Sequence, residues 1–191
     1  MTKKSQPTPS AALKNTAQAA QNLSEEMDII DLHIDTFIPN RLWGYNPLQS
    51  HSGGPFGRHF FGHLDLPRMT AGGLNAAMWS ITTNPFRTPK GRWRTFQQNL
   101  IRFRKMVSES EGQLEMVKNH REYREAINHN AHAVLLSIQG GNAFEAASDG
   151  ALSLPDEMTR VTLIHLTNAA FGATSSPDHI WRGQKLSLIH I

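Results

Sequence analysis

Short apolar runs alternate along the chain with longer stretches in which apolar residues recur every three or four positions. The runs at 27–32, 74–82, 133–138 and 161–166 predict four strands, and their lack of polar alternation predicts strands buried on both faces. The other stretches predict helices at 11–26, 65–71, 92–108, 121–128 and 155–160. Strands that alternate with helices indicate an α/β fold with a parallel sheet. An open doubly wound sheet and part of a closed barrel both fit this pattern.

Polar side chains gather where the predicted strands end. His33 and Asp35 close the first run, Gln139 ends the third, and His165 belongs to the fourth. In parallel α/β folds the carboxyl ends of the strands share one edge, and the chemistry is concentrated there. A histidine and an aspartate two apart on a strand point to the same face. Their imidazole nitrogen and carboxylate oxygen can then bind one metal ion.

These residues also have purely structural explanations. The His-x-Asp pattern arises by chance, and it recurs at His63 and Asp65, where Asp65 suits the N-cap of the helix predicted at 65–71. A single histidine near a strand end, such as His165, is more often a hydrogen-bonded structural residue than a ligand. The basic residues of the helix at 92–108 are typical of a solvated face rather than a nucleic-acid site.

The composition excludes several kinds of chemistry. The 191 residues include ten histidines and no cysteine, so a metal site must use His, Asp, Glu or polar oxygen ligands. A net charge of +3 does not by itself imply a nucleic-acid partner. No apolar run reaches the roughly 20 residues of a membrane span, and no apolar region follows Lys3 and Lys4, so we expect a cytoplasmic protein. Gly140 and Gly141 lack the spacing of a phosphate loop, which argues against nucleotide binding.

Four blocks of sequence resemble one enzyme family. MDIIDLHIDT, HLDLPRMTAGGLNAAMWSI, LLSIQGGNAFE and RVTLIHLTNAAFG follow in order between residues 19 and 172. Together they resemble the membrane (renal) dipeptidase family of zinc metallopeptidases, whose members have an amidohydrolase-type barrel. The resemblance implies the N-terminal half of a (β/α)8 TIM-type barrel, truncated after about four β/α units. It implies a partial barrel domain at 11–183, with a disordered tail at 1–10 and a non-native C-terminal scar at 184–191.

The resemblance also assigns roles to the residues at the strand ends. His33 and Asp35 fall on the ligands of the first of two Zn²⁺ ions. Gln139 falls where the family has a glutamate that bridges both ions, and a neutral amide there should weaken a paired site and leave one ion or none. His165 falls on the catalytic histidine that contacts the substrate and helps polarise the scissile carbonyl. The second ion's histidines and the aspartate base lie on later strands of the family barrel.

The expected activity is therefore hydrolysis of dipeptides by a metal-bound hydroxide, with the 191-residue fragment alone inactive. Two alternatives stay open: another amidohydrolase with an altered metal site, and a non-catalytic paralogue. The expected partner is a dipeptide or small amide substrate, without nucleic acid or a membrane span. A homodimer of the full-length form is left open.

Overall fold

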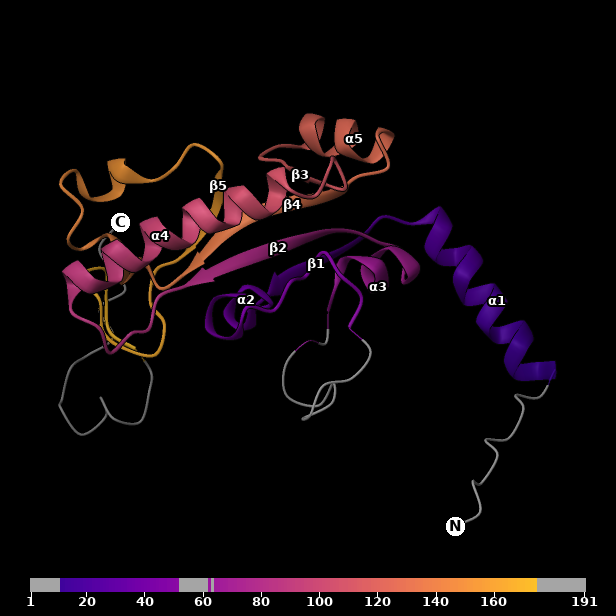
Figure 1. Ribbon diagram of the computed structural model, residues 1–191, viewed down its shortest axis with the longest axis horizontal. Helices are drawn as coiled ribbons and strands as arrows, with labels where there is room; N and C mark the ends of the chain where they lie inside the picture. Colours follow the sequence, from indigo (N-terminus) through magenta and orange to yellow (C-terminus); the bar gives the residue numbers. More distant parts are fainter. Residues whose placement is uncertain (1–10, 52–61, 63, 175–191) are drawn as a thin grey trace, which may run out of the picture.

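The computed structural model describes residues 11–51, 62 and 64–174, drawn in colour in Figure 1. The tail predicted at 1–10, the scar predicted at 184–191 and His63 lie outside the described residues. Along the described chain the elements are α1 (Ala11–Glu26), β1 (Ile29–Ile34), α2 (Phe37–Trp43), α3 (Leu66–Ala71), β2 (Leu74–Thr82), α4 (Pro89–Ser108), β3 (Leu114–Met116), α5 (His120–Asn128), β4 (His132–Gln139), the 3-10 turns η2 (Gly141–Phe144) and η3 (Gly150–Ser153), and β5 (Met158–Thr162).

The five strands form one parallel sheet. β2 lies between β1 and β4, while β3 pairs with the beginning of β4 and β5 with its end. The carboxyl ends of β1, β2, β4 and β5 therefore lie along one edge, where the predicted site residues are found. The predicted α/β class with a parallel sheet is confirmed.

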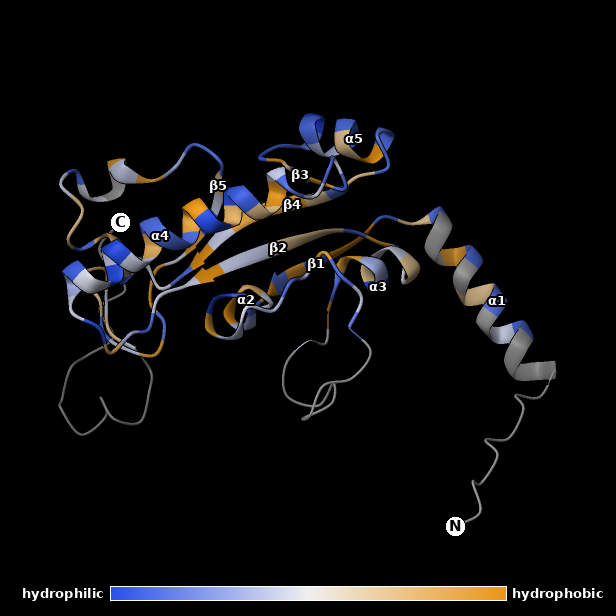
Figure 2. Cartoon of the chain, viewed as in Figure 1, coloured by the Kyte–Doolittle hydropathy of each residue, from blue (hydrophilic) through white to orange (hydrophobic). Residues whose placement is uncertain are grey.

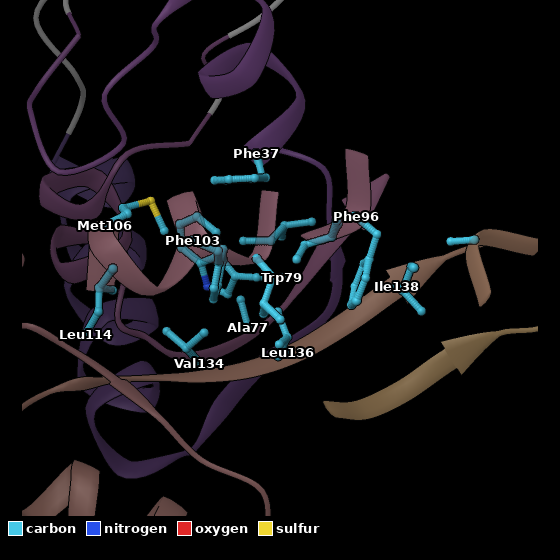
Figure 3. Packing of buried hydrophobic residues seen from close by; sticks show 14 of the residues in the cluster. Phe37, Ala77, Trp79, Phe96, Phe103, Met106, Leu114, Val134, Leu136 and Ile138 are labelled. Carbon is cyan, nitrogen blue, oxygen red and sulfur yellow. The ribbon is translucent and has the colours of Figure 1, made fainter. Parts of the chain in front are cut away.

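One face of the sheet packs against α2, α3 and α4. The residues that β2 and β4 turn toward these helices are fully buried and apolar: Ala77, Trp79, Ile81, Val134, Leu136 and Ile138. Figure 3 shows Trp79 and Leu136 among the aromatic side chains of Phe37, Phe96 and Phe103 from the helices. In Figure 2, α4 alternates between hydrophobic and hydrophilic segments, as an amphipathic helix should.

The opposite face of the same strands carries polar residues. Because side chains alternate along a strand, Ser80 and Ser137 point away from the helices. Both serines are buried, and their hydroxyl oxygens lie 2.7 Å apart. This face contains the candidate site.

Local sequence explains where two of the helices begin. The side chain of Asp65 accepts a hydrogen bond of 3.0 Å from the backbone N–H of Arg68, which caps α3, and Pro67 stands in its first turn. Thr88 caps α4 in the same way through the backbone N–H of Gly91. The predicted cap at Asp65 is confirmed, and its capping role accounts for that residue without a metal.

The structure differs from the predicted elements in several places. β1 begins two residues later than predicted and includes His33. The expected burial of this strand on both faces is wrong. Among the described strands β1 pairs only with β2, and Leu32 is 64% exposed. The predicted helix at 155–160 is wrong, since β5 begins at Met158 and Arg160 lies on a strand. α2 and β3 were not predicted. Of the helices that the structure describes, none combines the length and hydropathy needed to cross a membrane.

Candidate functional site

His33 and Asp35 lie side by side at the end of β1. Nε2 of His33 is 3.3 Å from Oδ2 of Asp35, and both side chains are about two-fifths exposed, at 38% and 41%. The other carboxylate oxygen, Oδ1, is shielded from solvent and has no hydrogen-bond partner among the described residues. A shielded carboxylate oxygen without a donor, next to an imidazole nitrogen, fits the ligands of a cation.

The second ring nitrogen of His33 has two neighbours. Its Nδ1 lies 3.2 Å from Oγ of Ser80 and 2.9 Å from the Nη2 of Arg160. The guanidinium is a donor only, so its contact requires a bare Nδ1 and a proton on Nε2. The serine oxygen can instead accept from a protonated Nδ1, which leaves Nε2 free to bind a metal. As an acceptor, Ser80 therefore favours a different tautomer of His33 from the one that Arg160 favours.

Gln139 and His165 line the same cavity as Asp35, with a volume of about 700 Å³. Gln139 is the last residue of β4 and stands opposite Thr82 of β2 and Thr162 of β5. Burial lowers the pKa of His165; the Asp35 carboxylate raises it in part, and His33 lowers it further. The four residues predicted at the strand ends are thus brought to one region, with His33 and Asp35 in direct contact.

Gly140 follows Gln139 and lies close to His165, in a conformation that suits glycine. Its φ is +108°, a conformation that L side chains rarely adopt. A Cβ there would lie 3.0 Å from Oδ1 of Asn142 and 3.9 Å from Cβ of His165. A larger residue would therefore strain the backbone at this position and crowd the side chain of Asn142.

Hydrogen bonds from the 3-10 turn η2 and the residue after it hold the segment that follows β5. Nδ2 of Asn142 donates to Oγ1 of Thr167 over 3.1 Å, and Oε1 of Glu145 accepts from the backbone N–H of Ala170 over 2.7 Å. Arg92 then pairs with Glu145 at 2.6 Å. Arg92 is only 7% exposed, so its assignment to a solvated helix face is wrong: it anchors α4 to this turn.

The remaining acidic candidate does not join the site. Asp65 is fully buried, and it accepts hydrogen bonds from Arg68 and from the backbone N–H of His51. Burial alone would raise its pKa, but these hydrogen bonds outweigh burial and lower it. Within residues 11–51, 62 and 64–174, no group of three or more His, Asp or Glu side chains is placed to hold a metal ion.

Two residues near the site, Ser137 and Arg160, are not identified from the sequence, and Ser80 is found there only as a residue at the end of the second predicted strand. Alternation with apolar neighbours places Ser80 and Ser137 on one face of the sheet. Arg160 falls in the helix predicted at 155–160. Assigning 158–162 as a strand would have placed it on the same face as Ser137, its partner in the β4–β5 register.

A comparison with protein families places most of the chain in one of them. The sequence profile of membrane dipeptidase, peptidase family M19, matches residues 17–185. No curated protein matches the chain.

Several solved structures resemble the fold. The probable dipeptidase PvdM from Pseudomonas aeruginosa superposes with a TM-score of 0.64 at 18% identity, over 86% of this chain and 41% of its own. A metallopeptidase from Rhodobacter sphaeroides, liganded with a phosphinate mimic of the dipeptide L-Ala-D-Ala, gives 0.52 at 17% identity, over 66% and 41%. At such identities the likeness shows the fold, and it agrees with the predicted class, part of a TIM-type barrel. The chain spans about two-fifths of the length of these structures.

Proposed function

Because the chain belongs to the membrane dipeptidase family of metallopeptidases, we propose that the complete protein, of which this chain is a part, is a zinc-dependent dipeptidase. The observation that carries the proposal is the contact between His33 and Asp35, 3.3 Å apart, with Oδ1 of Asp35 shielded and without a donor. The phosphinate dipeptide mimic bound by the R. sphaeroides enzyme supports a dipeptide as the substrate.

The described residues have separate tasks in this proposal. His33 and Asp35 would hold Zn²⁺ through Nε2 and the carboxylate. When bound, the metal supplies Lewis-acid polarisation and lowers the pKa of water. His165 lines the same cavity as Asp35, and it would donate a hydrogen bond to the scissile carbonyl oxygen as negative charge develops there. Its burial excludes part of the solvent, which strengthens that interaction.

Gln139 favours a second candidate function. Its neutral amide stands where the family resemblance implies a bridging carboxylate, and one amide oxygen offsets no charge between two cations. An amidohydrolase with a single metal and a substrate other than a dipeptide is therefore the alternative. A non-catalytic paralogue, with the fold retained and no metal bound, is the third.

The resemblance implies that the second ion's histidines and the base belong to later strands of the family barrel. We therefore propose that the 191 residues alone are inactive. The cytoplasmic location, the homodimer and the domain bounds 11–183 stay predictions.

Activity and metal content of the purified complete protein test the proposal together. After zinc loading and dialysis, we expect hydrolysis of simple dipeptides and two zinc ions per chain by elemental analysis. We expect His33→Ala to abolish hydrolysis, while His120→Ala, an exposed histidine of α5, leaves it unchanged. One zinc ion with no dipeptide hydrolysis supports the altered amidohydrolase, and a folded protein without metal supports the paralogue. Either result overturns the dipeptidase proposal.

A further inference from the structure

The cavity beside Asp35 is strongly basic. Four arginines line it: Arg41, Arg87, Arg94 and Arg102. Asp35 is the single carboxylate among its described lining residues, and that side chain faces His33. The cavity, of about 700 Å³, therefore combines the proposed reaction site with a concentration of positive charge.

The arginines come from three different elements. Arg41 belongs to the last turn of α2, and Arg87 to the connection between β2 and α4. Arg94 and Arg102 lie on α4, four positions before and four positions after Gln98. Gln98 lines the same cavity. Residues four apart share one face of a helix. A solvated basic helix face would not account for Arg41 and Arg87, which reach the cavity from other elements.

These guanidiniums lack the carboxylate partners that other arginines of the protein have. Nη1 of Arg41 donates to the backbone oxygen of Thr82 over 2.6 Å, and the described residues supply no ion pair to Arg41, Arg87, Arg94 or Arg102. By contrast, carboxylates pair with arginines elsewhere in the structure: Asp65 with Arg68, Glu145 with Arg92, Glu157 with Arg104 and Asp28 with Arg124.

The like charges of the cavity act on one another. Burial lowers the pKa of Arg41, and the charges of Arg87 and Arg102 lower it further. Such repulsion opposes folding unless an anion balances it. Arginine suits this task, because its planar guanidinium binds a carboxylate through two parallel hydrogen bonds.

We propose that the arginines of this cavity bind an anionic side chain of the substrate, so that the preferred dipeptides carry an aspartate or glutamate residue. The inference rests on the proposed dipeptidase function, since it places the scissile bond beside Asp35 and His165. A dipeptide held there extends an adjoining side chain into the basic part of the same cavity. A carboxylate in that position meets arginines that have no anionic partner among the described residues.

The test compares Ala-Glu with Ala-Gln, which have nearly the same shape and differ by one charge. Each is assayed with an L and a D second residue, using the complete zinc-loaded protein. We expect kcat/KM for Ala-Glu to exceed that for Ala-Gln by about tenfold, as charge-assisted bonds allow. The double variant Arg94→Gln and Arg102→Gln should remove this ratio, mainly through KM, and high salt should reduce it. Arg104→Gln, on the same helix but paired with Glu157 outside the cavity lining, should retain it.

Each further outcome bears on one proposal. Hydrolysis of both dipeptides at equal efficiency, or a ratio that survives the double variant, overturns the acidic preference and leaves the dipeptidase function standing. If neither dipeptide is cleaved, calorimetric titration decides the inference separately: arginine-dependent binding of Ala-Glu over Ala-Gln supports it. Inorganic phosphate that binds through the same arginines, with no preference for Ala-Glu, indicates a free-anion site and overturns the substrate assignment.

Discussion

Oγ of Ser80 lies 3.2 Å from Nδ1 of His33 and 2.7 Å from Oγ of Ser137, and either serine can donate the bond between them. When Ser137 directs its proton to the backbone oxygen of Trp79, 3.3 Å away, Ser80 donates to Ser137. Ser80 is then an acceptor toward His33. This arrangement favours the tautomer with a proton on Nδ1 and a free Nε2, which is the form that binds a metal.

We therefore expect Ser80→Ala to weaken zinc binding by the complete protein by about tenfold, because partners of a ligating histidine contribute at that level. The alanine removes the acceptor, and Arg160, 2.9 Å from the same Nδ1, then favours the other tautomer. Competition with a chromophoric chelator measures the affinity. Ser108→Ala, an exposed serine on α4, is the matched control. Equal zinc affinity in Ser80→Ala and wild type would show that the serine does not position His33.

The charge missing at Gln139 yields a second prediction. Gln139→Glu adds a carboxylate beside Asp35 in the same cavity, and a carboxylate can offer one oxygen to each of two cations. We expect the second zinc ion to be held more tightly than in wild type, measured by competition with a chromophoric chelator. Gln113→Glu, an exposed residue before β3, controls for a general effect of added negative charge. Unchanged zinc affinity in Gln139→Glu would contradict a bridging role for this position.

The sequence predicted those parts of the fold that local signals determine. Two glycines precede β2, and the first and last residues of this strand were predicted correctly. The burial of β1 was predicted wrongly because an apolar run does not reveal whether another element will cover the strand. Ile30 and Leu32 of β1 are exposed at the edge of the sheet. The segment around Arg160 was misassigned because Pro155 and Asp156 suit a helix start, whereas pairing with β4 determines its conformation.

The candidate site also contains residues that the sequence could predict and residues that it could not. His33, Asp35, Gln139 and His165 could be proposed because parallel strands bring their carboxyl ends to one edge. The four-arginine cavity could not, since Arg41 and Arg94 are separated by 53 positions and meet only once α2 and α4 pack on the sheet. The sequence placed Arg94 and Arg102 on one predicted helix, but it carried no information about which elements that helix would contact.

A third prediction concerns the anchor between α4 and the turn after β4. Arg92 pairs with Glu145 and donates to the backbone oxygens of Asn142 and Arg87 at 3.1 and 2.5 Å. Arg92→Met removes these bonds and leaves the largely buried Glu145 without its counter-charge, so we expect the free energy of unfolding to fall by about 3 kcal/mol. Urea unfolding measures this loss. Lys105→Met, which removes an exposed pair with Glu109 on the same helix, should change stability little. Similar losses in both variants would mean that burial of Arg92 adds nothing.

The last prediction follows from His132 at the start of β4. The residue is 6% exposed; burial lowers its pKa from 6.5 to about 4, while a hydrogen bond of 3.0 Å from Nδ1 to the backbone oxygen of Leu74 partly opposes the shift. The folded state thus binds this proton less readily than the unfolded state. The stabilising contribution of neutral His132 is fully present above pH 6.5. It is lost as the pH falls from 6.5 toward 4, by about 3 kcal/mol in all.

His132→Asn keeps a donor near Leu74 and removes the titration, so the free energy of unfolding should vary less across this interval than in wild type. His120→Asn, an exposed histidine, should retain the wild-type slope. Urea unfolding at half-unit steps from pH 4 to 7 separates the two, and parallel curves for wild type and His132→Asn would refute the assignment.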